Sequence, residues 1–592
     1  MKLETETLRA RVGAARDVSG RALLAERVSG GWWEGRLSSS ALATATAVMA
    51  LELAGSEPEK LLIGPGVEWL VRTQREDGGW GDTPESLANL STTLLVVAAL
   101  RLAGGEAGRE ALGRAMEWVR GKAGGVEPEV LARALEARYG KDRTFSVPIM
   151  MACAIGGVLG PAPECWRHVP QLPFELASLP RRWYAALQLP VVSYALPALI
   201  AIGQVRLHHR PRRHPLTLLR WSQRGRTLKL LEAIQPEGGG YLEATPLTAF
   251  VTMALASAGL GRHAVARRAL GFLTASARSD GSWPIDTNLA TWVTSLSVKA
   301  LAGVPGAVFD SGPAVAAWMR AQQTTAVHEY TLSAPGAWGW TDLPGGVPDA
   351  DDTSAALLAL AVPGMGEHDA AAAAGVRWLL GLQNRDGGMP TFCRGWGALP
   401  FDRSTPEITA HALAALHEWR HLAVPGMARA MEAMARYLAK TQEADGSWLP
   451  LWFGNERARG EANPVYGTAC VVRYLHGLAG TRAMCDEGAA YLVGSQRSDG
   501  AWSGAGEAGP ATVEETALAL HALALSLVRS EASEVVLGRG AEALLRLTDG
   551  GREAPAAPIG LYFARLWYHE RLYPRIFQTA ALAALAVRWR DE

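Results

Sequence analysis

Three carboxylates fall within four residues, at Asp349, Asp351 and Asp352, directly before the apolar run SAALLALA. That run has helical spacing, so Asp349 can cap the helix while the other two face the positive end of its dipole. The other interpretation is acid chemistry. Burial and neighbouring like charges both raise the pKa of a carboxyl group and would keep one member protonated. A protonated acid shielded from water can donate its proton to a weak base such as an alkene.

A metal site is a third interpretation of the same cluster, because carboxylates bind Mg²⁺, usually together with substrate phosphates. The chain has no Walker-type phosphate loop and no DDxxD pattern beside the cluster. Its five cysteines are widely spaced without a CxxC pair, which argues against a disulfide framework or a zinc knuckle. The residues alone therefore leave helix capping and acid chemistry open, and neither of them needs a metal or an organic cofactor.

The overall composition narrows the function further. Lys and Arg number 58, as do Asp and Glu, so the chain has no net charge and is not expected to bind nucleic acid. Hydrophobic residues make up 48%, which excludes global disorder. Tryptophan is unusually frequent, with 21 Trp against 12 Tyr and 10 Phe. Aromatic faces stabilise a nearby cation by roughly 0.5–2 kcal/mol without capturing it.

A short pattern recurs along the chain: the end of an amphipathic helix, usually a Gln, and then a turn of the form acidic-Gly-x-aromatic. Its copies end at Trp80, Tyr241, Trp283, Met389, Trp448 and Trp502, with a degenerate copy at Trp33. Ala/Leu-rich segments of helical spacing follow most copies. The Gly ends a helix, and the Gln amide can satisfy open groups at a neighbouring helix end. We interpret these residues as structural fasteners of a helical repeat fold.

Repeated helix hairpins can close into a ring, so the expected fold class is all-α with two α/α barrels. The expected division is an N-terminal segment, 1–24, that packs on the catalytic barrel, a second barrel at 25–275, and the catalytic barrel at 280–592. Within the second barrel, 189–214 joins an apolar stretch to a basic cluster. That segment could contact a membrane surface, or it could be a buried helix followed by a solvated loop.

The repeats, together with Asp349-Ala350-Asp351-Asp352-Thr353, resemble the class II triterpene cyclases, specifically the squalene–hopene cyclases. The resemblance covers nearly the whole chain. It implies that Asp351 is the proton donor, that Asp349 and Asp352 are its charged neighbours, and that His411 in Thr-Ala-His orients the acid. Taken without the resemblance, a lone His411 on an apolar helix reads as a core histidine.

The resemblance also implies a set of residues around the substrate. These are Trp292, Trp340, Phe392, Trp452, Tyr466, Tyr562 and Phe563, with Glu407 in an outer proton-relay network. Some positions depart from the family pattern: Met389 replaces a motif Trp, and Pro190 falls where the family often has one. Substrate length and product ring pattern therefore stay open.

The expected function is protonation of a terminal double bond of squalene or a similar linear polyprenoid, followed by cyclisation to a hopene- or hopanol-like triterpene. The alternatives within this chemistry are oxidosqualene, a diterpenyl diphosphate or a meroterpenoid. A diphosphate would need a basic cluster at the mouth of the pocket, and the sequence does not show one. Two alternatives lie outside this chemistry. One is a zinc prenyltransferase-like barrel, although Cys393, Asp402 and His411 lack convincing spacing for a zinc site. The other is a non-catalytic helical scaffold.

The resemblance implies a linear isoprenoid lipid as substrate, a peripheral, monotopic position on the cytoplasmic face of a membrane, and a homodimer. The charged N-terminus lacks a secretory apolar region, and no run of 18 apolar residues appears. We therefore expect contact with the membrane surface and no spanning helix.

Overall fold

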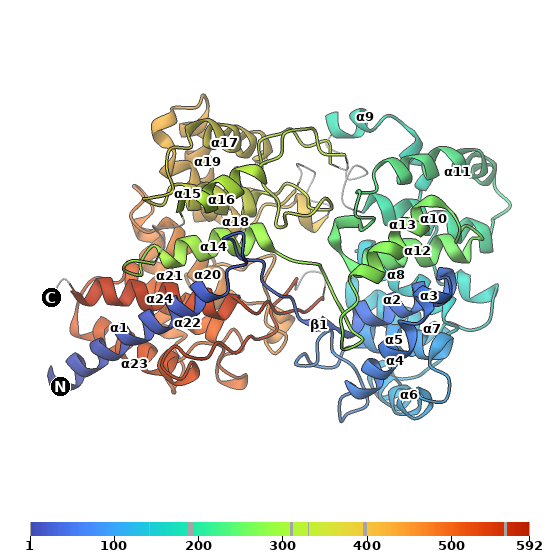
Figure 1. The fold of residues 1–592 in the computed structure, drawn as a ribbon, viewed down its shortest axis with the longest axis horizontal. Coiled ribbons are helices and arrows are strands. Elements are labelled where there is room, and N and C mark those ends of the chain that lie inside the picture. Colours follow the sequence, from blue (N-terminus) through green and yellow to red (C-terminus); the bar gives the residue numbers. More distant parts are fainter. Residues whose placement is uncertain are drawn as a thin grey trace.

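The computed structural model describes residues 2–140, 142–187, 195–307, 312–329, 331–392, 394, 399–561 and 565–590. The described chain forms two helical lobes that lie side by side (Figure 1). Each lobe has its own hydrophobic core. One core is built from residues between 41 and 283, and the other from residues 12–37 and 285–589. The predicted all-α class is confirmed.

The amino-terminal barrel closes through its inner helices. These are α2 (Ala41–Ala54), α5 (Leu90–Ala103), α8 (Arg143–Ile155), α10 (Leu196–His209) and α12 (Thr245–Ser257). Each packs on the next, and α12 returns to α2. The outer helices are α4 (Ile63–Arg72), α6 (Arg109–Ala123), α7 (Pro128–Tyr139), α11 (Pro215–Ala233) and α13 (Ala264–Ala275), with the short α3 (Glu57–Lys60) and α9 (Arg181–Ala186) beside them. The result is an α/α barrel.

The carboxy-terminal barrel closes in the same way. Its inner helices are α14 (Ala290–Leu301), α16 (Ala350–Leu360), α18 (Pro406–Glu418), α20 (Pro464–Leu475), α22 (Val513–Ser526) and α24 (Tyr573–Arg590), and α24 returns to α14. The outer helices are α17 (Asp369–Leu382), α19 (Met427–Thr441), α21 (Arg482–Gly494) and α23 (Glu531–Leu547); α15 (Gly312–Ala321) precedes the acidic cluster. The N-terminal helix α1 (Lys2–Ala25) packs on α23 and α24. The strands β1 (Ser39–Ser40) and β2 (Trp283–Pro284) pair antiparallel, with Ser39 opposite Pro284.

The two helix layers follow from the sequence pattern. Inner helices such as α2 are apolar on every side and almost wholly buried, whereas outer helices such as α19 have one apolar face. A helix that is apolar all round has to be surrounded by other helices. The inner ring therefore needs a complete outer layer, which the repeated hairpins supply.

The repeated turns hold the layers together as predicted. Gln442 donates from Nε2 to the carbonyls of Gly446, in its own turn, and Met484, at the start of the next outer helix, at 2.9 and 3.0 Å. Equivalent pairs of bonds occur at Gln74, Gln235, Gln323, Gln383 and Gln496. The Trp448 indole donates to the Leu438 carbonyl at 2.9 Å, ten residues earlier. The interpretation of the motif residues as fasteners is confirmed.

The apolar segment within 189–214 is mostly a core helix. Helix α10 is buried from Leu196 to Leu207 inside the amino-terminal barrel, and residues 188–194 lie outside the described part of the chain. Exposed large apolar side chains occur instead on the flanking elements, at Leu176, Leu179, Trp183, Leu187, Leu216, Leu218, Leu219 and Trp221. Within the described ranges, no helix combines the length and the apolar character needed to cross a bilayer.

Candidate active site

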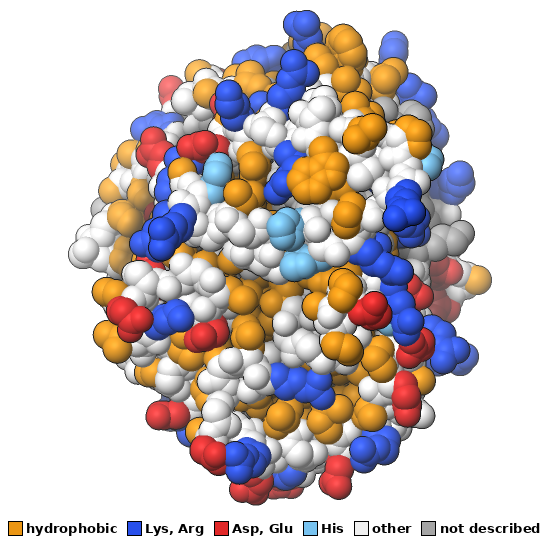
Figure 2. Space-filling view, turned by 90° about the vertical axis from the view of Figure 1, so that its right-hand side faces the viewer, with side chains coloured by type: hydrophobic (Ala, Val, Ile, Leu, Met, Phe, Trp, Pro, Cys, Tyr) orange, Lys and Arg blue, Asp and Glu red, His pale blue; other side chains and the backbone are white. Residues whose placement is uncertain are grey.

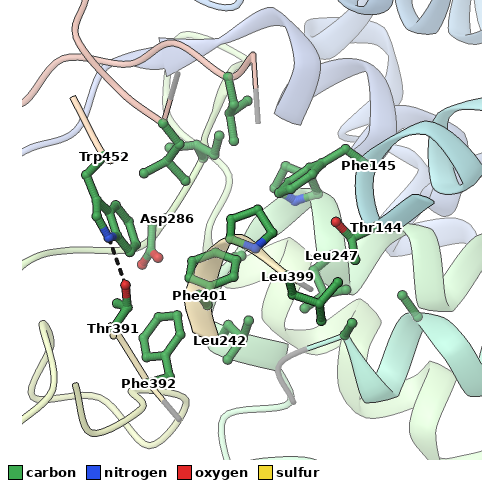
Figure 3. A pocket seen from close by; sticks show the side chains of 18 of the residues that line it. Thr144, Phe145, Leu242, Leu247, Asp286, Thr391, Phe392, Leu399, Phe401 and Trp452 are labelled. Atoms are coloured by element: carbon green, nitrogen blue, oxygen red, sulfur yellow. Dashed lines mark hydrogen bonds between the residues drawn. The ribbon is translucent and has the colours of Figure 1, made fainter. Parts of the chain in front are cut away.

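A cavity of about 640 Å³ lies between the two barrels. Its volume falls within the ~300–1,000 Å³ that is usual for small-molecule sites. Helices α8, α10 and α12 supply its wall on one side, and α14, α16 and the loops around Thr391, Trp452 and Tyr568 supply the other side. Figure 3 shows Phe401, Leu399 and Leu242 grouped around this space, with Asp286 among them. The wall is predominantly apolar and aromatic, with carboxyl groups concentrated on the carboxy-terminal side.

The acidic cluster opens on this cavity. Asp349 is the N-cap of α16, and its Oδ1 accepts the Asp352 backbone N–H at 2.8 Å. The capping interpretation is therefore confirmed for Asp349. Helix capping is not the only role open to these residues, however, because Asp349, Asp351 and Asp352 all line the cavity. The helix start thus delivers three acids to one apolar space.

Asp351 is held by the predicted histidine. Its Oδ1 lies 2.6 Å from Nδ1 of His411, which is buried on α18. The Asp351 side chain is 25% exposed, and because it lines the cavity this exposed part faces the interior space. Burial raises the pKa of Asp351 to about 7, and the cations of Lys299 and Arg473 oppose that rise. Burial and the same cations keep the pKa of His411 well below its ordinary value.

These directions define a proton arrangement. A neutral His411 can donate its Nδ1–H to Oδ1 of Asp351, which leaves the acid proton on Oδ2 and directed to the cavity. Burial also raises the pKa of Asp349 to about 7, although its hydrogen bonds from Asp352 oppose the rise. Burial and the charge of Asp349 raise the pKa of Asp352 well above its ordinary value. The cluster as a whole therefore retains protons near neutral pH.

Four aromatic rings form one wall beside the acid. The Phe392 ring lies 6.0 Å from Trp340, 4.9 Å from Phe401 and 6.3 Å from Trp452, centroid to centroid. Trp292 meets the His411 ring edge-on at 6.2 Å. Ring faces in a dry cavity can stabilise positive charge without bonding to it. This wall is suited to a reaction in which a cation develops next to the acid.

Trp452 is fixed to the acid-bearing helix by two partners. Its indole Nε1 donates to the Thr391 hydroxyl at 3.0 Å (Figure 3), and the Thr391 carbonyl accepts the Ala350 N–H at 2.9 Å. Glu407 accepts the Leu451 backbone N–H at 2.7 Å. These bonds set the distance between the aromatic wall and the carboxylates. Glu407 is therefore a support for the Trp452 loop.

The structure brings together most of the predicted residues. Asp349, Asp351, Asp352, Trp292, Trp340, Phe392 and Trp452 line the cavity, and His411 lies directly behind Asp351. One prediction needs correction, because Tyr466 is not a wall residue; Glu407 does not line the cavity either, which is compatible with the outer position expected of it. Tyr466 packs behind Phe453, with the two rings 4.8 Å apart, and it is Phe453 that faces the cavity. Tyr562 and Phe563 lie outside the described residues.

Several wall residues were not predicted: Phe145, Phe250, Asp286, Phe401, Phe453 and Tyr573. Tyr568, in the same aromatic-rich C-terminal segment as Tyr562 and Phe563, also lines the cavity, and the sequence left the register of that segment open. Asp286 and Phe401 follow turn motifs, and nothing in their local sequence separates them from ordinary loop residues. Among the described residues, no group of three or more His, Cys, Asp or Glu could hold a metal ion, and Cys393 is not among those residues.

Comparison with known proteins places this geometry in context. The family model for the squalene–hopene cyclase N-terminal domain matches residues 17–152, and the model for the squalene–hopene cyclase C-terminal domain matches residues 289–586. A probable squalene–hopene cyclase of Sinorhizobium fredii is 28% identical over 328 residues, which is 49% of this chain and 49% of that protein. An ent-copalyl diphosphate synthase of a Streptomyces species is 29% identical over 303 residues, 50% of this chain and 51% of that protein.

The matches to the curated relatives span about half of their length or less. A solved structure has broader coverage: ent-copalyl diphosphate synthase from Streptomyces platensis aligns with 97% of this chain and 99% of that chain. Its TM-score is 0.58 and its sequence identity 20%, so this likeness concerns the two-barrel fold.

Proposed function

Because the chain belongs to the squalene–hopene cyclase family of class II terpene cyclases, we propose that it protonates the terminal double bond of a linear polyprenoid and guides the resulting cation through ring closure. One observation carries the proposal: Asp351 is a half-buried acid, bound by His411 at 2.6 Å, whose exposed part opens on an aromatic-walled cavity. Asp351 acts as the proton donor in this proposal. Asp349 and Asp352 are its acidic neighbours at the start of α16, and burial raises the pKa of both.

The geometry supports the following sequence of events. The polyprenoid substrate lies against Trp292, Trp340 and Phe392, with its terminal alkene at Oδ2 of Asp351. The O–H bond breaks, a C–H bond forms, and the tertiary cation is attacked by the next double bond. The preorganised aromatic rings and the fixed conformation of the bound polyprenoid accelerate ring closure. Loss of a proton or capture of water ends the cascade, which for squalene gives a hopene- or hopanol-like product.

The direct test is incubation of the detergent-solubilised protein with squalene, followed by gas chromatography–mass spectrometry of the lipids. New cyclic isomers of unchanged mass, or hydrates one water heavier, are expected. Oxidosqualene and prenylated aromatic acids form the second arm. If folded protein leaves every one of these substrates and geranylgeranyl diphosphate unchanged, the proposed reaction is rejected.

A second candidate is a polyprenoid with an anionic head group such as a diphosphate, and it rests on a separate observation. Arg143, Arg403 and Arg565 line the predominantly apolar cavity, and the first two are exposed side chains at its rim. Arg565 also pairs with Glu461. These arginines supply the positive charge that a diphosphate substrate requires. An elongated substrate could place its head at these arginines and its terminal alkene at Asp351, and the similar ent-copalyl diphosphate synthase supports this possibility by its name.

We expect Arg143→Ala and Arg403→Ala to separate the two candidates. A hydrogen bond to a charged group contributes about 1.5–3 kcal/mol, so losing one arginine would raise KM for geranylgeranyl diphosphate roughly tenfold or more. Turnover of squalene would stay unchanged in the same variants. Arg436→Ala, at an exposed arginine of α19 outside the cavity wall, is the matched control. Wild-type KM for the diphosphate in both rim variants would reject the second candidate.

The proposed acid role also sets a pH dependence. The acid must carry its proton, so kcat/KM should be full below pH 7 and fall as pH rises through about 7, the raised pKa of Asp351. The pKa of Asp349 is also raised to about 7, and repulsion between the two carboxylates spreads the loss over a wider pH range. A pH–rate profile measures this limb directly. A profile that already falls near pH 4, the ordinary carboxyl value, would argue against Asp351 as the acid.

We also propose that the enzyme works at a membrane surface. Figure 2 shows apolar side chains among Lys and Arg on the upper part of the face that carries α11. The exposed apolar residues there include Trp183, Leu218 and Trp221, and Arg212 and Arg213 are exposed nearby in sequence. Apolar and basic side chains together favour contact with anionic lipid. A monotopic homodimer on the cytoplasmic face is the arrangement we propose.

A further inference from the structure

Lys299 is a half-buried lysine whose Nζ is buried without an evident structural purpose. Burial lowers the pKa of Lys299 to about 7, and the charge of Asp351 opposes that fall. It is the only charged residue of α14, and its Nζ has no hydrogen-bond acceptor among the described residues. Burying an ammonium group without a paired partner destabilises a fold, and an apolar side chain of similar length would pack at least as well. The reason for a lysine here should therefore lie in what its charge acts on.

Its neighbours lead to the acid. The Lys299 Nζ lies 4.8 Å from the centre of the Tyr474 ring. That ring stacks on the His411 imidazole at 4.2 Å with an angle of 14° between the planes, and His411 contacts Asp351 at 2.6 Å. Arg473 lies over the same tyrosine ring at 4.7 Å, but its guanidinium also binds the Tyr474 hydroxyl. A cation thus stands behind the Asp351–His411 pair, on the side away from the substrate cavity.

We propose that Lys299 is a positioning residue of the proton transfer: its ammonium, held by the Tyr474 ring, stabilises the carboxylate that Asp351 becomes when its proton leaves. The inference rests on the proposed function. In the step concerned, the O–H bond of Asp351 breaks, a C–H bond forms on the substrate, and the negative charge stays on Asp351. Stabilising that charge makes Asp351 a stronger acid, although burial keeps it protonated beforehand.

A second consequence concerns His411. A positive charge behind the ring disfavours protonation of the imidazole, so His411 stays neutral and remains a donor to Oδ1 of Asp351. The other charged or titratable groups that interact with this site come from four inner helices. They are Asp349 and Asp352 on α16, Glu407 on α18, Tyr466, Cys470, Arg473 and Tyr474 on α20, and His521 on α22.

The test is Lys299→Met, with Lys299→Arg as the variant that keeps the charge. We expect Lys299→Met to lower kcat by about tenfold, because one pKa unit of acid strength corresponds to a tenfold change in equilibrium. Removing the cation raises the pKa of Asp351, so the alkaline limb of kcat/KM should move to higher pH. Thermal stability should stay equal or rise, because an unpaired buried charge has been removed. Lys299→Arg should keep the fall of kcat/KM at the wild-type pH.

A purely structural lysine would behave differently. Its loss would lower stability and activity together and leave the pH at which kcat/KM falls unchanged. That result would overturn the proposal. A wild-type kcat in Lys299→Met would overturn it as well. The proposed function has its own readout, because Lys299→Met should still convert substrate slowly to the same products. If neither wild type nor variant forms product from any substrate, the failure lies with the proposed function. In that case the titration of Asp351 is followed by NMR in the wild type and in Lys299→Met. An unchanged titration midpoint in Lys299→Met would reject the inference about Lys299.

Discussion

Asp351→Asn is expected to abolish cyclisation, with a loss of at least roughly 10³-fold in turnover, in a protein that still folds. The amide has the same shape and can keep a hydrogen bond with His411, which lies 2.6 Å from the carboxylate in the wild type. It has no acidic proton to give to an alkene. Product analysis by gas chromatography–mass spectrometry and the melting temperature of the same sample measure the two properties separately.

The neighbouring position offers a matched control. Asp349→Asn retains an N-cap, because Asn caps helices about as well as Asp. It removes one charge from beside Asp351 and should reduce turnover far less than Asp351→Asn does. Substantial turnover in Asp351→Asn would show that the proton comes from another group, and Asp352 would then be the next candidate.

Trp448→Ala is expected to destabilise the carboxy-terminal barrel by about 3–5 kcal/mol, although Trp448 does not line the cavity. The side chain is fully buried, and its indole donates to the Leu438 carbonyl at 2.9 Å. The ring also packs directly on Gly488, where an added Cβ would lie 2.8 Å from it. Removing the ring leaves a large void and takes away the short hydrogen bond to the Leu438 carbonyl, to which only the longer bond from the Thr441 hydroxyl, at 3.4 Å, then remains.

Thermal unfolding measures this prediction, and Trp221→Ala is the control. Trp221 is 40% exposed on α11, so its removal leaves no enclosed cavity. A melting temperature in Trp448→Ala equal to that of Trp221→Ala would contradict the fastener role. Trp448→Phe should fall between wild type and alanine, because it restores most of the volume and none of the hydrogen bond.

The fold and the acid were predictable because their signals are local. Turn and helix end stand together in each repeat, and Asp349 to Asp352 are adjacent in the chain. His411 could be assigned by resemblance alone, since its 60-residue separation from Asp351 is bridged only by the packing of α18 on α16. The rim arginines come from three distant segments, so no sequence window contains the cluster.

Loop residues were the least predictable part. Whether Phe453 or Tyr466 faces the cavity depends on how the loop after Trp452 turns, and periodicity does not describe a loop. The apolar segment around α10 was ambiguous for a different reason. A helix that is apolar on all sides can be covered by lipid or by protein, and here the inner ring of the barrel covers it. Lys299 was overlooked, although one charge within an apolar helix is itself a signal.

The cavity takes its acid from one barrel and much of its opposite wall from the other. In the proposed reaction, initiation and the template for folding the substrate therefore come from different barrels. Exchange of α8, α10 and α12 for those of a relative should alter which substrate is accepted and how far its chain can fold, while the start of the reaction is conserved. A chimera of this kind would inherit its product range from the amino-terminal parent and its pH profile from the carboxy-terminal one. Diversification of such enzymes can therefore proceed without touching the group that begins the chemistry.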